Sequence, residues 1–259
     1  KCDWSSDVCS SDLIVASGRK FVLIAGPSSS GKTTFSNRLA VQLRAMGKHL
    51  SPVECDNYFT DRSTYPKDPD GNQDYESIEC VDIERLNQDL ISLAAGEEVE
   101  TPVFNFLSGK REPTGKKVRI PKDDIIVLEG IHCLNDKLTY RIASANKFKI
   151  YISALTPMNI DEHTHISTSD GRLLRRICRD AAKRGYTARE TISRWKSVRD
   201  GEEKNIFPYQ ESADVMLNSA LIYESAVLKP YAEPLLFSVP EDCPEYIEAK
   251  RLLKFLDYF

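Results

Sequence analysis

Residues 26–33 read Gly-Pro-Ser-Ser-Ser-Gly-Lys-Thr, which matches the pattern G-x-x-x-x-G-K-[ST] in full. The two glycines let the backbone curl so that its N–H groups face a phosphate, and a helix starting after them adds its positive N-terminal dipole. Lys32 has the length to reach the β- and γ-phosphates, and the Thr33 hydroxyl is suited to Mg²⁺. We therefore predict a P-loop for ATP and Mg²⁺, formed by Gly26, Pro27, Ser28, Ser29, Ser30, Gly31, Lys32, Thr33 and Thr34.

The segments around this loop alternate between strand and helix patterns. A continuous apolar run at 21–25 predicts a strand buried on both faces, and residues 33–46 carry apolar side chains at helical spacing up to Gly47. Further strands are predicted at 51–55, 125–128 and 148–154, and a further helix at 81–95. The alternation predicts an α/β fold, with a parallel sheet flanked by helices.

Composition excludes several other classes of protein. The 259 residues include 35 Lys+Arg and 39 Asp+Glu, and 41% of them are hydrophobic, which is typical of a folded globular protein. No apolar run approaches the ~18 residues of a membrane span, and no basic excess indicates nucleic-acid binding. Seven scattered cysteines without a C-x-x-C pair favour reduced thiols in a cytoplasmic protein.

The first thirteen residues follow neither the strand pattern nor the helix pattern; they read Lys-Cys-Asp-Trp-Ser-Ser-Asp-Val-Cys-Ser-Ser-Asp-Leu. They show no apolar periodicity, and they lack the basic region followed by an apolar region that a signal peptide has. Residues 3–13 resemble the translation of a sequencing-library adapter, so we interpret 1–13 as non-native and 14–259 as the folded domain. A natural Ser/Asp-rich tail is the alternative.

Two acidic residues directly follow predicted strands. Asp56 comes after the strand at 51–55, beside the P-loop, where its carboxylate is placed to accept a proton from an attacking hydroxyl. Glu129 follows the strand at 125–128, where an acid holds Mg²⁺ directly or through water in P-loop enzymes. An Asx-turn for Asp56 and a helix cap for Glu129 remain as alternatives.

Residues 170–184 place basic side chains on one face of a predicted helix, at Arg172, Arg175, Arg176, Arg179 and Lys183. A solvated face usually alternates acids with bases, whereas this one is nearly all arginine, whose planar fork suits phosphate. We predict an arginine-rich helical lid over about 160–200 that closes on the transferring group; a solvated surface is the alternative.

Together these pieces resemble the uridine kinase / phosphoribulokinase family of P-loop kinases over most of residues 21–199. The similarity is carried by the P-loop, by D-N-Y-F at Asp56, P-V-F-N-F at Pro102, V-L-E-G-I at Val127 and D-G-R-L-L-R-R-I-C-R-D at Asp170. Residues 206–219 resemble a bacterial nucleoside-kinase branch in which an N-terminal domain similar to that of threonyl-tRNA synthetases precedes the kinase.

The resemblance implies roles for particular residues. Asp56 would be the catalytic base toward a ribose 5′-hydroxyl, and Asp74 and Arg172 would hold the ribose hydroxyls. Arg175 and Arg179 would lie near the ATP phosphates. Tyr58, Phe104 and Phe106 are candidates for stacking on the base, although aromatic residues in a domain are more often core. The family usually has Tyr in place of Phe104 and His in place of Gly109, so the identity of the base does not carry over.

The histidines receive structural interpretations. His163 and His165 form an H-x-H pair without a third ligand nearby in sequence, which favours a surface at the lid hinge over a metal site. His132 is expected to be a structural histidine rather than a general base.

We expect an ATP- and Mg²⁺-dependent kinase that phosphorylates the 5′-hydroxyl of a uridine- or cytidine-like nucleoside. The alternatives are a kinase for another sugar-like hydroxyl, such as a phosphopentose or pantothenate, and a non-catalytic nucleotide-sensing module. A homo-oligomer and a missing N-terminal domain are left open. The apolar face of 245–259 ends abruptly, and we expect natural sequence to continue beyond it.

Overall fold

The computed structural model describes residues 3–67, 71, 73–112, 117–155 and 167–259. The chain forms two compact units. The first comprises Lys1–Pro27, Gly31–Ile152 and Gly201–Leu217, and the second comprises Ser28–Ser30, Ser153–Asp200 and Asn218–Phe259.

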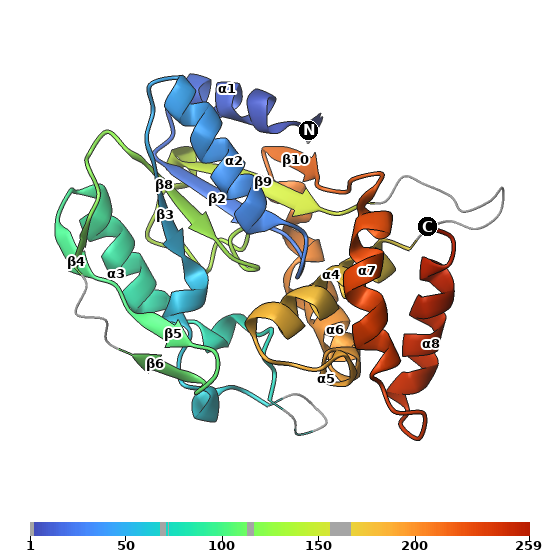
Figure 1. Ribbon diagram of the computed structural model, residues 1–259. Helices are drawn as coiled ribbons and strands as arrows, with labels where there is room; N and C mark the ends of the chain where they lie inside the picture. The colour runs from blue at the N-terminus through green and yellow to red at the C-terminus, as the bar shows by residue number, and fades with distance from the viewer. Residues whose placement is uncertain (1–2, 68–70, 72, 113–116, 156–166) are drawn as a thin grey trace. The chain divides into compact units, whose positions relative to one another are not determined.

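The first unit is built on a six-stranded sheet with the order β1-β10-β9-β2-β8-β3 (Figure 1). The strands are β1 (Asp3–Ser5), β10 (Val215–Asn218), β9 (Lys147–Ser153), β2 (Phe21–Ala25), β8 (Ile125–Glu129) and β3 (Leu50–Glu54). β2 pairs in parallel with both β8 and β9, and β8 pairs in parallel with β3. The predicted α/β fold with a parallel sheet is therefore confirmed, and each of the four predicted strands lies within one residue of its observed bounds.

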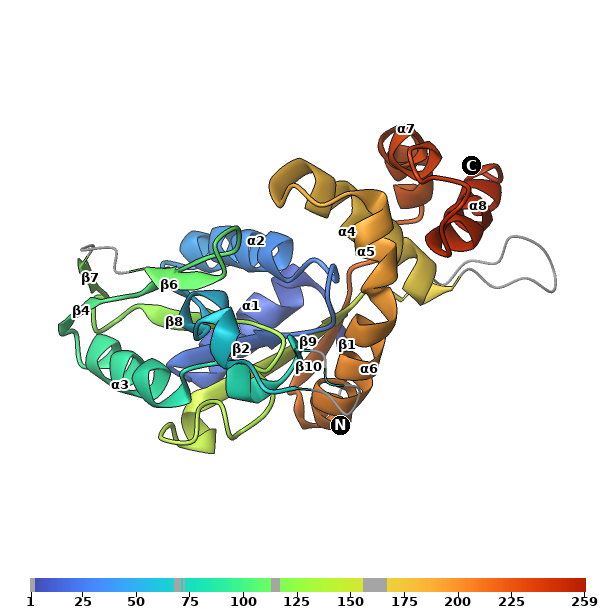
Figure 2. The ribbon, with the colours of Figure 1, turned by 90° about the horizontal axis from the view of Figure 1, so that it is seen from below.

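Helices cover both faces of this sheet, because the strands bury side chains on both sides. Val22 and Ile24 of β2 pack with α1 (Asp7–Ser17) and α2 (Lys32–Ala45), whereas Phe21 and Leu23 point to the opposite core with α3 (Ile83–Ala94). Figures 1 and 2 show α2 and α3 on opposite sides of the sheet. The helices predicted at 33–46 and 81–95 correspond to α2 and α3.

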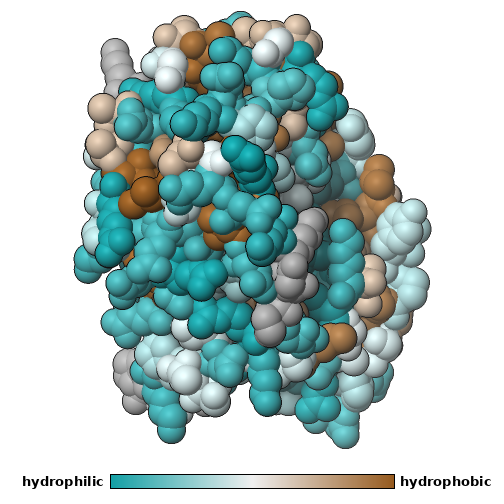
Figure 3. Space-filling view, turned by 90° about the vertical axis from the view of Figure 1, so that its left-hand side faces the viewer, coloured by the Kyte–Doolittle hydropathy of each residue, from teal (hydrophilic) through white to brown (hydrophobic). Residues whose placement is uncertain are grey.

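Two short antiparallel ribbons that the sequence patterns did not predict join this unit. β4 (Glu98–Glu100) pairs with β7 (Lys117–Arg119), and β5 (Val103–Asn105) pairs with β6 (Lys110–Glu112). The 3₁₀ turns of the described chain are η1 (Cys55–Tyr58), η2 (Arg62–Thr64), η3 (Ile78–Cys80), η4 (Ser144–Asn146) and η5 (Phe207–Ser212). The face around α3 and β4 is mostly hydrophilic (Figure 3), as expected for the outer side of an amphipathic helix.

The second unit is helical. α4 (Thr168–Lys183), α5 (Ala188–Ser193), α7 (Glu224–Phe237) and α8 (Glu245–Leu256) share one apolar core, and α6 (Trp195–Asn205) continues from this unit into the first. The predicted arginine-rich helix is α4. Leu252 and Leu256 are fully buried, so the apolar face predicted at 245–259 packs within this core.

The first residues of the chain take up regular structure. The described part of 1–13 forms β1, paired in parallel with β10, and the start of α1, whose Ser6 accepts a hydrogen bond from Cys9 N–H. The adapter origin of this segment stays a prediction. In the described ranges, no helix has the length and apolar character needed to cross a membrane.

His132 lies in the loop after β8 and is 3% exposed. Burial lowers its pKa to about 4, against an opposing effect of the nearby Ser77 backbone. The folded state therefore binds fewer protons than the unfolded state between the ordinary pKa of about 6.5 and pH 4. It follows that the free energy of unfolding falls as the pH is lowered through this window.

We expect His132→Leu to remove this acid sensitivity. A pKa difference of about 2.5 units corresponds to about 3 kcal/mol at 1.36 kcal/mol per unit, so the variant should gain that much relative to wild type between pH 7 and pH 4. Urea unfolding at a series of pH values measures the difference. His49→Leu, which changes an exposed histidine, is the control, and equal acid slopes for all three proteins would contradict the assignment.

Candidate functional site

The P-loop turns sharply between β2 and α2. Ser29 has φ +59° and Gly31, the N-cap of α2, has φ +87°, so two residues of the turn lie in the left-handed region. Ser29 is the one non-glycine residue of the described chain with a positive φ. α2 begins at Lys32, so its free N–H groups and positive dipole end lie at this loop, as the sequence predicts.

Each backbone carbonyl from Gly26 to Gly31 accepts a hydrogen bond. Lys32 Nζ donates to the carbonyls of Gly26 (2.9 Å) and Pro27 (3.2 Å). In the second unit, Arg172 Nε donates to Ser28 O (3.0 Å), Arg175 Nη1 to Ser29 O (3.1 Å) and Ser219 Oγ to Ser30 O. The N–H of Phe35 closes the series on Gly31 O. The carbonyl groups of the loop are thus all bound to donors of the protein.

The hydroxyls of Ser29 and Ser30 are buried, and nothing in the described chain bonds to them. A buried hydroxyl without a partner is costly, and a phosphate oxygen is an acceptor that satisfies it. This loop therefore fits the triphosphate that its sequence predicts.

Glu129, at the end of β8, accepts a hydrogen bond of 2.5 Å from the Thr33 hydroxyl. Burial raises the pKa of Glu129, and the neighbouring Asp56 and Glu54 carboxylates add to this rise. The hydrogen bond from Thr33 and the charge of Lys32 oppose it. A carboxylate short of compensating charge beside a threonine hydroxyl suits a hard cation such as Mg²⁺, so the two predicted metal ligands meet at one place.

Asp56 lies beside this pair. β3 pairs with β8 so that Glu54 is opposite Glu129, and Asp56 follows two residues later in η1. The close approach depends on Gly130, since a Cβ there would lie 2.7 Å from the Cβ of Cys55. Asp56 and Glu129 thus share the carboxyl edge of the sheet, as the strand order implies.

Asp74 belongs to the first unit, where α6 supports its loop. Lys204 Nζ lies 3.6 Å from the Asp74 carboxylate, and Asn205 Nδ2 donates to Glu76 O (2.9 Å). Gly201 allows this contact, because a Cβ there would meet the Cβ of Glu76 at 2.4 Å. The predicted ribose residue is therefore held on a braced loop.

The aromatic candidates are mostly core residues. Tyr58 is 1% exposed and donates its hydroxyl to Asp89 (3.0 Å), and Phe104 on β5 is 4% exposed. The roles of Tyr58 and Phe104 toward a nucleobase remain predictions. Phe106, the third candidate, is only partly buried, as is Phe59, and its role toward a nucleobase is a prediction as well.

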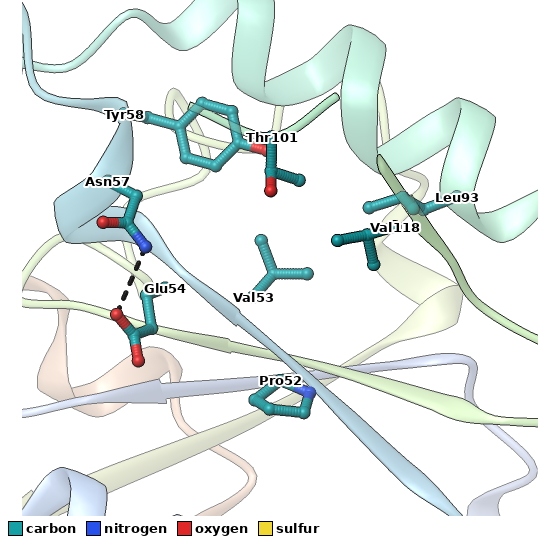
Figure 4. Close-up of a pocket in the computed structure, with 8 residues that line it drawn as sticks. All are labelled: Pro52, Val53, Glu54, Asn57, Tyr58, Leu93, Thr101 and Val118. Carbon is teal, nitrogen blue, oxygen red and sulfur yellow. Dashed lines mark hydrogen bonds between the residues drawn. The ribbon is translucent and has the colours of Figure 1, made fainter. Parts of the chain in front are cut away.

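Asn57 ties the β5–β6 ribbon to the Asp56 turn. Its Nδ2 donates to Glu54 Oε2 (3.2 Å) and its Oδ1 accepts from Phe104 N–H (3.4 Å). A cavity of about 190 Å³ lies beside this contact (Figure 4), lined by Pro52, Val53, Glu54, Asn57, Tyr58, Leu93, Thr101 and Val118. Asp56, the predicted catalytic base, is not among the residues that line the cavity, although its neighbour Asn57 is.

The arginines of α4 lie in the second unit. Arg172 is 1% exposed, stacks 5.4 Å over the Trp195 ring and binds the P-loop, whereas the family resemblance implies a contact with ribose. Arg176 Nη1 donates to Ser28 Oγ (2.8 Å), and Arg179 pairs with Asp180 (2.7 Å). The arginine face is thus bound to protein groups, and its contact with ATP or ribose remains a prediction.

Sequence reasoning missed Glu224 and Ser219, which hold Arg175. Glu224, the first residue of α7, forms an ion pair with the Arg175 guanidinium, which also donates to Ser219 O (3.0 Å). No local pattern marks this glutamate; the signal was the arginine face, which needs anionic partners once buried. His163 and His165 lie outside the described residues.

Known proteins resemble this chain over most of its length. The chain matches the phosphoribulokinase / uridine kinase family over residues 21–222. It is 27% identical over 195 residues to a uridine kinase of Limosilactobacillus reuteri (strain DSM 20016), covering 75% of this chain and 80% of that one. A uridine kinase of Cronobacter sakazakii (strain ATCC BAA-894) is 29% identical over 197 residues, with coverage of 75% and 84%.

A solved structure shares the fold. The structure described as a putative fructose transport system kinase from Silicibacter sp. TM1040 superposes with a TM-score of 0.56 at 18% identity, covering 82% of this chain and 98% of that one.

We expect a strong energetic coupling between Arg175 and Glu224. Their side chains are 15% and 24% exposed, so removing either one leaves a largely desolvated charge. A double-mutant cycle with Arg175→Met and Glu224→Gln, read by urea unfolding, should give a coupling of about 2 kcal/mol.

The control cycle uses Lys196 and Asp200, an ion pair of 86% and 60% exposure. Its coupling should be about 0.3 kcal/mol. Equal couplings for the two pairs would refute the view that Glu224 anchors the P-loop arginine.

Proposed function

This chain belongs to the phosphoribulokinase / uridine kinase family of P-loop kinases, and we propose that it transfers the γ-phosphoryl group of ATP to the 5′-hydroxyl of a nucleoside. The proposal rests chiefly on the carboxyl edge of β3 and β8. There Asp56 lies beside Glu129, whose carboxylate accepts the hydroxyl of the P-loop Thr33. A site that only binds nucleotide needs the P-loop but not a second carboxylate placed for a proton.

In the proposed reaction, Asp56 accepts the proton of the attacking hydroxyl as the phosphoryl group is transferred. The P-loop N–H groups and Lys32 bind the phosphates and stabilise the charge that develops on them. Thr33 and Glu129 would hold Mg²⁺, which would supply positive charge against the phosphates when bound. Positioning and charge stabilisation supply most of the rate enhancement in this type of transfer.

We assign Asp74 and Arg172 to the ribose hydroxyls, and Arg175 and Arg179 to the phosphates. The uridine kinase relatives and the motif match support these roles. Arg172 and Arg175 donate to the carbonyls of Ser28 and Ser29, which belong to the same unit. These bonds support a position of both arginines close to the triphosphate. The Asp74 loop, braced by α6, supports a fixed acceptor for ribose.

The relatives named as uridine kinases favour a small-molecule substrate with a pyrimidine-like base. The described cysteines are free thiols, in agreement with a reducing, cytoplasmic setting for the reaction.

Asp56→Asn should abolish turnover while leaving ATP binding nearly unchanged. An amide keeps the shape of the side chain but does not take the proton, so kcat should fall at least about 100-fold. ADP release with ATP, Mg²⁺ and a nucleoside panel measures kcat, and calorimetry measures ATP binding.

Asp123→Asn, which alters an exposed carboxylate before β8, is the matched control and should retain full activity. Near-normal turnover in Asp56→Asn would remove its assigned role. Phosphorylation of phosphopentose or pantothenate instead of any nucleoside would favour the other kinase class, and tight ATP binding without any acceptor would favour a sensor.

A further inference from the structure

The outer side of α7 carries a continuous apolar surface. The inner side of this helix, with Ala232 and Leu236, is buried in the core that α7 shares with α4, α5 and α8. On the opposite side, exposed and uncharged residues recur at helical spacing from the start of the helix to its last residue. We refer to them as the α7 face, which consists of Ile222, Tyr223, Ala226, Val227, Pro230, Tyr231, Pro234 and Phe237.

The α7 face is large for an exposed apolar surface. Its five largest side chains, at positions 222, 223, 227, 231 and 237, are 54–73% exposed. The eight residues together expose roughly 800 Å², whereas the largest apolar patch of a typical monomer covers about 300–600 Å². A stable interface of standard size takes about 800 Å² from each partner. The α7 face is therefore large enough to form one half of such an interface.

The charged residues of α7 are paired within their own unit. Glu224 binds Arg175, and Lys229 Nζ lies 3.7 Å from the carboxylate of Glu233, with both side chains of this second pair less than one third exposed. An identical face therefore meets no like charge, and an acidic or basic partner finds no excess of opposite charge. A helix that lies on a lipid surface is rich in lysine and arginine on its polar side, whereas α7 has a single lysine, and that lysine is paired.

Two prolines add hydrogen-bond acceptors to the α7 face. Pro230 and Pro234 lie inside the helix and have no N–H, so the carbonyls of Ala226 and Pro230 lose the donor that normally follows four residues later. The hydroxyls of Tyr223 and Tyr231 provide donors on the same face. A second copy of the face thus offers apolar area, donors and acceptors of the kinds that the first copy can use.

We propose that the α7 face is the interface of a symmetric dimer of this chain. An isologous interface uses the same patch on both subunits and closes at two copies, which suits a large, uncharged surface with donors and acceptors of its own. Because Tyr223 directly precedes Glu224, the interface adjoins the ion pair that holds the P-loop arginine Arg175. The inference goes beyond the proposed reaction and does not depend on it.

Analytical ultracentrifugation of the whole chain over a range of concentrations tests the proposal. Wild type should form a dimer with a Kd of about 1 µM or tighter and no larger species. Tyr231→Glu places an unpaired charge on both copies of the face and should weaken association at least about 100-fold. Tyr140→Glu changes an exposed tyrosine of the first unit in the same way; it is the matched control and should dimerise like wild type.

Val227→Lys is a second variant for the case that Tyr231→Glu does not fold, which circular dichroism detects. A monomer with the wild-type spectrum in either variant supports the interface. A wild-type chain that stays monomeric at about 200 µM overturns the proposal and leaves the face to a different protein or to a lipid surface. A dimer that both folded variants retain, or species that keep growing with concentration as a head-to-tail contact produces, overturns it as well.

Discussion

The structure depends on a hydrogen-bond constraint in six consecutive residues. A loop that presents its N–H groups to an anion must give its carbonyl groups to other donors, because a buried carbonyl without a partner is costly. Lys32 donates to the carbonyls of Gly26 and Pro27. Two arginines of α4 and Ser219 donate to the carbonyls of the three serines that follow. The arginine face, which resembles a phosphate clamp in sequence, is thus first a set of donors for the P-loop backbone.

A second constraint concerns the acids at the carboxyl edge of the sheet. The parallel register of β3 and β8 places Glu54 against Glu129 and brings Asp56 close to both. Burial and like charges raise the pKa of Glu129, and Lys32 and Thr33 offset only part of this effect. An edge with this excess of negative charge is stabilised by a cation, and the same cation is what a triphosphate needs. The acids and the P-loop therefore complete each other electrostatically.

Periodicity and motif predicted the parts of the fold that depend on local sequence. β2, α2, α3, β8, β9 and α4 follow from apolar runs and helical spacing, and the placement of Asp56 and Glu129 follows from strand order. The three-residue strands of the two ribbons were missed, because they are too short for an alternating pattern and depend on tertiary anchors such as Asn57. The contact between Arg62 and Gly109 and the ion pair between Arg175 and Glu224 join residues that are 47 and 49 positions apart along the chain. No sequence period operates over such separations.

Ser29 shows how the two kinds of information meet. The motif allows any residue at this position, yet the backbone there is left-handed, which costs a side-chain-bearing residue about 1 kcal/mol or more. The bond from Arg175 to Ser29 O offsets that cost, but an arginine that is 15% exposed requires an anion of its own, which Glu224 supplies. The strained loop therefore depends on a charge pair more than 140 residues away along the chain. A glycine at position 29 would need no such support, so the serine is better explained by its hydroxyl, which is buried, unbonded within the described chain and available to a phosphate.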